Sequence, residues 1–200
     1  MKSSAGGIQI TPLDPASYRH MPWKNGGGVT IDIAVTMLPG LAPGSWEGII
    51  WRFSRTAIVT PAPFSDLSGY DRELVLVSGE GLVLGTPVGE IDVRQAFRPV
   101  RFAGETSVVS RLEAGPVEVV NLIGARAKVR IALEVLKADG ALSVEPGTHL
   151  AYAAHGAAAL DVDGTPHRLA ADHALRIEVS GPTILKGIGG VLLLGSVICV

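Results

Sequence analysis

Glycine and proline interrupt almost every stretch of this chain, and this feature constrains the possible folds more than any other. The 200 residues include 25 glycines and 13 prolines, the two residues that weaken a helix interior most. The sequence therefore predicts an all-β fold, with one short helix at residues 14–19 opened by Asp14 and Pro15. The predicted strands are runs rich in β-branched residues, most of them bounded by turn-forming residues. They cover residues 8–11, 29–36, 48–58, 73–77, 81–84, 106–112, 117–122, 128–136, 149–153, 157–162, 174–179 and 191–200.

Two glycine-containing turns indicate that the chain has two similar halves. Residues 78–81 are predicted to join the apolar runs 74–77 and 82–84 as a hairpin. Residues 161–164 are predicted to join 157–162 to 167–169 in the same way. We therefore expect a duplicated barrel, with residues 1–125 as the N-terminal half and 126–200 as the C-terminal half. This boundary is approximate, and exchange of strands between the halves is compatible with it.

The composition excludes several classes of protein. Hydrophobic residues make up 47% and charged residues 18%, which is not the composition of a disordered chain. The net charge of −2 favours neither nucleic acid nor an anionic membrane as a partner. The N-terminal residues lack the apolar core of a signal peptide, and the most apolar stretch, residues 187–200, is shorter than the roughly 20 residues of a spanning helix. We expect a soluble, cytoplasmic protein, for which a homodimer is compatible with the sequence but not required.

The sequence predicts neither a metal nor another cofactor. The single cysteine, Cys199, lies in an apolar run and is predicted to be a buried hydrophobic residue. None of the 5 histidines forms a His-x-His pair. His155 and His167 flank a predicted turn, but two ligands do not make a metal site. There is also no Gly-x-Ser-x-Gly motif of a serine hydrolase.

The run Trp23-Lys24-Asn25-Gly26-Gly27-Gly28 is the first candidate for a binding site. Consecutive glycines are entropically costly, and they are tolerated where the backbone approaches a ligand or adopts positive φ. Lys24 would supply a cation and Trp23 a rigid apolar wall, so the run could form the lip of a pocket for an anionic or amide-bearing molecule. A plain hairpin loop with an exposed lysine explains the residues equally well. The run lacks the spacing and the following helix of a phosphate-binding loop.

The segment Trp51-Arg52-Phe53-Ser54 is the second candidate. Because side chains alternate along a strand, Trp51 and Phe53 are expected in the core while Arg52 and Ser54 share the other face. That face is either a barrel lumen, where an arginine can grip a carboxylate with two parallel hydrogen bonds, or solvent. Solvent exposure is the more common case for such an arginine.

A third candidate follows residues 63–70, which indicate a structured loop leading into a strand. The strand begins with Asp71-Arg72-Glu73, a cation between two anions. Arg72 could be a second inward arginine that completes an anion site. A surface cluster of salt bridges is the alternative, and the residues alone favour it.

Taken in order, these motifs closely resemble those of the HutD/Ves family. The resemblance covers about residues 8–130. Its blocks are Met21-Pro22-Trp23-Lys24-Asn25-Gly26-Gly27-Gly28-x-Thr30, Trp51-Arg52-x-Ser54, Pro63-Phe64-Ser65-x-x-x-Gly69-x-x-Arg72, Leu74 with Gly79-x-Gly81, Phe102-x-Gly104, Leu112-x-x-Gly115-Pro116, Asn121 and Arg126. The chain departs from the usual family residues at four positions, where Glu, Ala, Asp and Phe are replaced by Asp32, Thr56, Val119 and Val120 respectively.

The resemblance implies a bicupin, that is, two cupin-like barrels in one compact chain, without the usual cupin metal ligands. It also implies a role near histidine utilisation or stress response. The implied ligand is a small carboxylate such as urocanate or a formylated or formiminated glutamate. Together with the motifs, it gives a predicted ligand site of Trp23, Lys24, Asn25, Gly26, Gly27, Thr30, Asp32, Arg52, Ser54, Phe64, Ser65, Arg72 and Asn121.

Three functions are compatible with these residues, and we favour the first, which is not catalytic. It is a binding or regulatory protein in which Arg52 and Arg72 hold a carboxylate. The second is an enzyme acting without metal on a small amide, imine or sugar acid, with Lys24 or Asp32 as the acid or base. The third is a structural bicupin whose signature residues serve only to pack the barrels.

Overall fold

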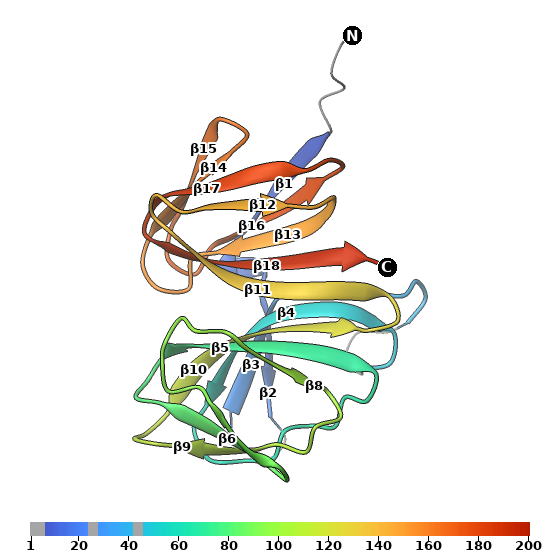
Figure 1. The fold of residues 1–200 in the computed structure, drawn as a ribbon, viewed down its shortest axis with the longest axis vertical. Helices are drawn as coiled ribbons and strands as arrows, with labels where there is room; N and C mark the ends of the chain where they lie inside the picture. Colours follow the sequence, from blue (N-terminus) through green and yellow to red (C-terminus); the bar gives the residue numbers. More distant parts are fainter. Residues whose placement is uncertain (1–6, 24–27, 42–45) are drawn as a thin grey trace. The chain divides into compact units, whose positions relative to one another are not determined.

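The computed structural model describes residues 7–23, 28–41 and 46–200, and these residues form an almost entirely β fold (Figure 1). This confirms the predicted all-β class. Among the described residues, the only helical element is the 3-10 turn η1 (Pro15–Ser17). The strands are β1 (Ile8–Leu13), β2 (Arg19–Pro22), β3 (Gly28–Met37), β4 (Ile49–Ile58), β5 (Tyr70–Ser78), β6 (Leu82–Thr86), β7 (Gly89–Asp92), β8 (Val100–Ala103), β9 (Val109–Leu112), β10 (Val117–Ala125), β11 (Val129–Lys137), β12 (Ala141–Val144), β13 (Gly147–Tyr152), β14 (Ala158–Val162), β15 (Thr165–Leu169), β16 (Ala174–Val179), β17 (Thr183–Gly189) and β18 (Val191–Cys199).

The helix predicted at residues 14–19 is wrong. Asp14 does cap the turn, because its Oδ1 accepts a hydrogen bond of 2.8 Å from the backbone N–H of Ala16. However, Tyr18 is buried and Arg19 already begins β2, which pairs with β3. One turn of helix is too short to persist alone, so the chain enters the sheet instead.

Contacts divide the chain into two compact units. The first unit comprises residues 18–131 and Val200, and the second comprises residues 1–17 and 132–199. The first unit holds a six-stranded sheet in the order β2-β3-β4-β10-β5-β8 and a three-stranded sheet in the order β7-β6-β9. Its apolar core draws on strands of both sheets and consists of Ile58, Leu74, Leu76, Leu82, Leu84, Val93, Phe102, Val108, Val117 and Val119.

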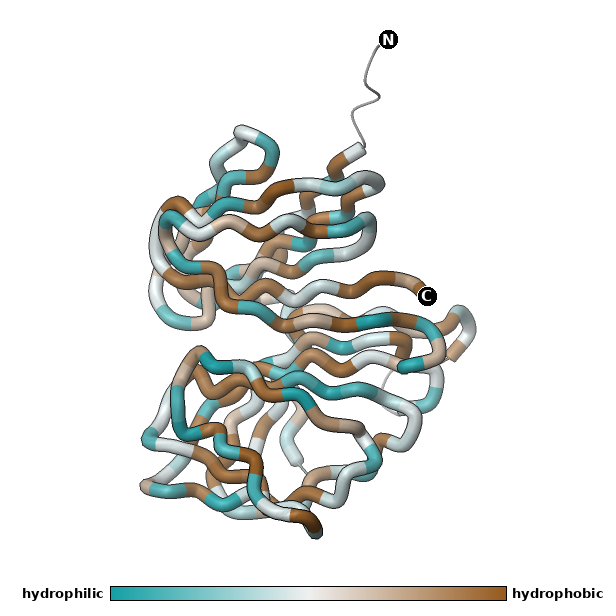
Figure 2. The backbone as a smooth tube through the Cα atoms, viewed as in Figure 1, coloured by the Kyte–Doolittle hydropathy of each residue, from teal (hydrophilic) through white to brown (hydrophobic). Residues whose placement is uncertain are grey.

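The second unit is also built from two sheets. Their strand orders are β1-β16-β13-β18-β11 and β12-β17-β14-β15. Strand β1, from the start of the chain, forms an edge by pairing with β16, with Ile8 opposite Val179. The core of this unit includes Leu160, Ile177, Leu185 and Leu194. Figure 2 shows hydrophobic residues recurring along the strands, as expected when one face of each strand is buried.

The two predicted hairpins have different outcomes. The turn at 161–164 joins the paired strands β14 and β15, with positive φ at Asp163 and Gly164, so this prediction is confirmed. The hairpin at 78–81 is wrong, because β5 and β6 belong to different sheets. Gly79 and Gly81 do adopt positive φ. A Cβ at Gly79 would lie 2.7 Å from the Pro116 carbonyl oxygen, so the turn packs tightly against the chain entering β10 while the chain crosses between the sheets.

The C-terminal segment differs from expectation at one residue. The predicted final strand, residues 191–200, corresponds to β18, and its residues 192–197 are buried. Cys199, predicted to be buried, is exposed, because burial along β18 ends before the strand does. Within the described parts of the chain, no helix is long and apolar enough to cross a membrane.

A buried histidine in the second unit predicts pH-dependent stability. Nε2 of His149 lies 2.9 Å from the carbonyl oxygen of Glu145, and Nδ1 lies 2.9 Å from Oγ of Ser196. Since a carbonyl only accepts, Nε2 carries the proton and Nδ1 accepts from the serine hydroxyl. Burial lowers the pKa of His149 below its usual 6.5, so the folded protein holds this side chain neutral.

We therefore expect the free energy of unfolding to fall as the pH drops below about 6.5. The unfolded state then gains a proton at His149 that the folded state resists, whereas above that pH both states are neutral. Urea unfolding at about pH 5.5 and pH 7.5 measures the effect. His149→Gln is expected to flatten the dependence, and the exposed His155→Gln is the control. An unchanged slope in His149→Gln contradicts the assignment.

Candidate ligand-binding site

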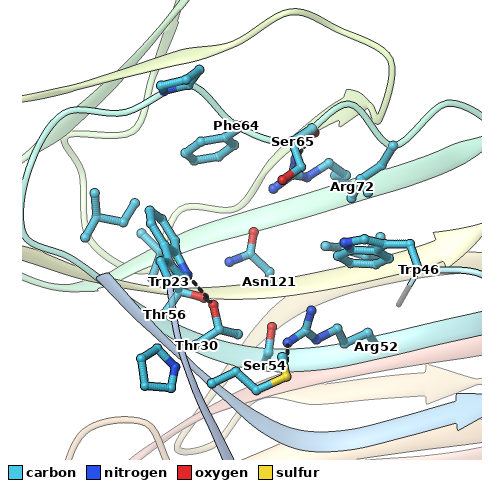
Figure 3. A pocket seen from close by; sticks show the side chains of 17 residues that line it. Trp23, Thr30, Trp46, Arg52, Ser54, Thr56, Phe64, Ser65, Arg72 and Asn121 are labelled. Atoms are coloured by element: carbon cyan, nitrogen blue, oxygen red, sulfur yellow. Dashed lines mark hydrogen bonds between the residues drawn. The ribbon is translucent and has the colours of Figure 1, made fainter. Parts of the chain in front are cut away.

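A cavity of about 520 Å³ opens on one face of the six-stranded sheet in the first unit. That volume is typical of small-molecule sites. Because side chains point alternately to the two faces of a strand, every second residue lines the cavity. These are the residues from 52 to 58 on β4 and from 119 to 123 on β10. The full lining is Met21, Pro22, Trp23, Thr30, Trp46, Arg52, Ser54, Thr56, Ile58, Pro63, Phe64, Ser65, Leu67, Arg72, Val119, Asn121 and Ile123 (Figure 3).

Strand register brings the two predicted arginines into one row across the sheet. Ile123 on β10 lies opposite Arg52 on β4 and opposite Arg72 on β5. Since neighbouring strands are about 4.8 Å apart, the α carbons of the two arginines are about 10 Å apart. The next row places Asn121 opposite Ser54. The sheet therefore presents two guanidinium groups, an amide and a hydroxyl to the same cavity.

Arg72 is a buried cation with no acidic partner among the residues that the structure describes. It is only 8% exposed, and its guanidinium lies 4.8 Å from the ring centre of Phe64 and 5.2 Å from that of Phe102. Its one hydrogen bond among the described residues is a long one, 3.5 Å from Nη1 to the carbonyl oxygen of Ser65, and Nε has none. Burial lowers the pKa of Arg72 to about 10, so the group is still charged at neutral pH.

The positive charge of Arg52, in contrast, is paired with a carboxylate. Its Nε donates a hydrogen bond to Oδ1 of Asp32, and the two side chains form a buried ion pair. The other carboxylate oxygen of Asp32 accepts a 2.8 Å hydrogen bond from Nη2 of Arg19. The Arg52 guanidinium also lies 5.2 Å from the ring centre of Trp46. Asp32 is not part of the cavity lining. It lies opposite Ser54 on the neighbouring strand, and its ion pair holds the Arg52 side chain in position.

Asn121 leaves hydrogen-bonding capacity unused between the two arginines (Figure 3). The residue is 6% exposed, and its Oδ1 is buried with no hydrogen-bond partner in the described structure. A buried polar atom without a partner costs about 1–3 kcal/mol. Such an atom beside a cavity indicates that a ligand or solvent completes the site.

Trp23 is fixed in place by a chain of hydroxyl groups. Its Nε1 donates a 2.9 Å hydrogen bond to Oγ1 of Thr30, which lies 3.3 Å from Oγ1 of Thr56. The ring also packs on Gly28, where a Cβ would lie 3.3 Å from two indole carbons and 2.2 Å from the carbonyl oxygen of Ala57. The last glycine of the run is therefore required by close approach of an aromatic ring and a neighbouring strand.

This contact predicts a large effect of Gly28→Ala. We expect the free energy of unfolding to fall by about 2–4 kcal/mol, because the new methyl group forces β3 away from β4 or displaces Trp23. Gly85→Ala is the matched control, since a Cβ there would make only an ordinary contact at 3.6 Å with the carbonyl oxygen of Val109. Equal urea midpoints for the two variants would show that Gly28 is not sterically required.

The described structure places most of the predicted site residues in this cavity. Asp32 is not part of the lining, and Lys24, Asn25, Gly26 and Gly27 lie outside the described residues. The predicted residues that line the cavity are Trp23, Thr30, Arg52, Ser54, Phe64, Ser65, Arg72 and Asn121. Sequence reasoning missed Met21, Pro22, Trp46, Thr56, Ile58, Pro63, Leu67, Val119 and Ile123. Extending the strand alternation from residues 52 and 54 would have found Thr56 and Ile58.

The residues of the run 71–73 face both sides of β5. Arg72 points into the cavity, while Asp71 turns to the other face of β5 and bonds Arg101 and Arg126, each at 2.8 Å. Arg126 also bonds Glu105. The surface cluster therefore exists, but without Arg72. In the described ranges, no three His, Cys, Asp or Glu side chains are grouped to hold a metal ion.

The fold and the cavity define a cupin-like β-barrel protein. At 9% identity, a Cupin 2 conserved barrel domain protein from Leptotrichia buccalis superposes with a TM-score of 0.53, covering 86% of this chain and 89% of that one. This likeness concerns the fold alone.

Comparison of the whole sequence identifies the family. The HutD family model matches residues 15–192, so the chain belongs to the HutD family, as its motifs predict. An uncharacterised 21.2 kDa protein from the hutC 3′ region of Pseudomonas putida is 32% identical over 174 residues, covering 85% of this chain and 87% of that protein. Two solved structures each cover 96% of this chain and 100% of their own. They are PA5104 of Pseudomonas aeruginosa PAO1, at 27% identity and TM-score 0.81, and HutD of Pseudomonas fluorescens SBW25, at 25% and 0.79.

Two of the four departures from the usual family residues, Thr56 and Val119, line the cavity. Asp32 holds Arg52, and Val120 is fully buried. These four positions therefore contribute to the cavity surface and to the residues that support it.

Proposed function

We propose that this protein binds a small carboxylate metabolite of histidine breakdown, as a regulatory or accessory protein and not as a catalyst. The observation that carries the proposal is Arg72, a buried cation facing the cavity with no carboxylate within 4 Å among the described residues. Burying an isolated charge is costly, and a ligand carboxylate would remove that cost through paired, charge-assisted hydrogen bonds. Arg52, Ser54, Ser65 and Asn121 surround the same space.

The names of the relatives support the pathway. One is encoded beside hutC, and another is named HutD. The structure gives no support to acid–base catalysis by Asp32, because both of its oxygens accept hydrogen bonds from arginines. We place the protein in the cytoplasm, as a bicupin that forms either a monomer or a homodimer, which light scattering distinguishes.

Isothermal titration calorimetry with urocanate, N-formyl-L-glutamate and N-formimino-L-glutamate tests the proposal. At least one acid is expected to bind, and at about 100 times its Kd it should stabilise the protein by about 2.7 kcal/mol. Neutral analogues, in which the carboxylates are replaced by amides, are expected not to bind. The absence of binding by all three acids would overturn the proposal.

A further inference from the structure

The cavity has a charged end and an apolar end. The arginine row, with Ser65 and Trp46, lies at one end, while Trp23, Thr30 and Thr56 lie at the other (Figure 3). Thr56 is four residues beyond Arg52 on β4, or about 13 Å of strand. The apolar residues Ile58 and Val119 also belong to the end that holds Trp23, since residue 119 pairs with residue 56. One end of a ligand in this cavity is therefore expected to contact the charged arginines, and the other end is expected to contact mainly apolar side chains.

The charged end is built around two arginines. Arg52 and Arg72 are the only charged residues among the described lining. Asp32 is shared by Arg52 and Arg19, and Arg72 has no counter-charge among the described residues. The charged end therefore carries net positive charge, and the carboxylate of a ligand is expected to bind there.

The apolar end is shaped to receive a flat group. The only hydrogen-bond donor of the Trp23 indole is already satisfied by Thr30, so the ring offers a ligand no unused polar atom. Its orientation is fixed by that bond and by contact with Gly28. Phe64 adds a second ring to the lining. Rigid aromatic surfaces favour planar partners through offset-stacked or edge-to-face contacts.

We propose that the preferred ligand is a planar, unsaturated carboxylic acid, with its carboxylate at Arg72 and its flat body against Trp23. This inference rests on the proposed function, because it specifies which of the small carboxylates the site selects. Among the acids named above it selects urocanate over the two glutamate derivatives, which are flexible and not planar. Asn121 lies between the ends and can hydrogen-bond a polar atom in the middle of the ligand.

Calorimetry with trans-urocanate, trans-cinnamate, N-formyl-L-glutamate and acetate tests this choice. We expect both planar acids to bind at least about tenfold more tightly than N-formyl-L-glutamate, and acetate to bind most weakly. Tighter binding of N-formyl-L-glutamate would overturn the inference and leave the proposed function intact. If no acid binds, both fail.

Substitution of Trp23 tests whether its ring is the surface against which the planar acids pack. Trp23→Leu is expected to weaken binding of the planar acids about fivefold to tenfold and that of acetate by less than about twofold. Val88→Ala, at a fully exposed position outside the cavity, is the control. Equal losses for planar and small acids would contradict a stacking role for Trp23. Should Trp23→Leu fold poorly, the affinity ranking of the wild-type protein still decides the question.

Discussion

Arg72→Met is expected to weaken binding of the carboxylate at least thirtyfold without lowering the stability of the free protein. The loss of affinity follows because truncating one partner of a buried, hydrogen-bonded charge pair costs about 2–5 kcal/mol. The unchanged stability follows from the free state, in which Arg72 is buried with no counter-charge in the described part of the chain. Methionine removes that buried charge and still makes favourable sulfur contacts with the rings of Phe64 and Phe102. Most other binding-site substitutions are not expected to lower ligand affinity while leaving the stability of the free protein unchanged.

Calorimetry and urea unfolding of the same preparation measure both quantities. Arg98→Met removes the same charge from an exposed position that does not line the cavity, so it is expected to change neither by more than about 0.5 kcal/mol. A large loss of stability in Arg72→Met would mean that Arg72 is a structural residue. Unchanged affinity would mean that the carboxylate binds elsewhere.

Asp32→Ala is expected to lower the free energy of unfolding by about 3–5 kcal/mol, the usual cost of leaving a buried charge without its partner. The charge left behind is that of Arg52, since only 10% of its side chain is exposed. The second partner, Arg19, is 43% exposed, so Arg19→Met is expected to cost less than about 1 kcal/mol.

A double variant separates the buried charge from other effects of the substitution. Arg52→Met in the Asp32→Ala background removes the unpaired cation and is expected to recover part of the lost stability, whereas additive losses would contradict the assigned pair. The urea midpoints of the single and double variants give the double-mutant cycle for the pair Asp32–Arg52.

Alternation of side chains predicted the centre of the site from the sequence. The segment 51–54 is predicted to bury Trp51 and Phe53 and to turn Arg52 and Ser54 away, and the structure confirms this. The same rule did not decide between a lumen and solvent for Arg52. That choice depends on which strands pair with β4, and pairing is a non-local property.

Other parts of the site depend on tertiary contacts that no local pattern reveals. Trp46 lies outside any predicted strand, and its place at the cavity depends on contacts with Tyr70, whose ring packs against it and whose hydroxyl lies within 3.0 Å of the carbonyl oxygens of Trp46 and Ile49. The short strands β2, β7, β8 and β12 were not predicted, because each has only 4 residues and pairing stabilises them more than propensity does. Local turn chemistry likewise predicted a hairpin at 78–81 where the chain crosses between sheets.

The central claim is that a ligand carboxylate pairs with Arg72. The most direct test follows the Nε–H resonance of Arg72 by ¹H–¹⁵N NMR, assigned by its disappearance in Arg72→Met, while urocanate or N-formyl-L-glutamate is added. Because Nε has no hydrogen-bond partner among the described residues, the resonance is expected to move in a saturable way as the acid binds. Saturable binding by calorimetry with an unmoved Arg72 resonance would contradict the claim.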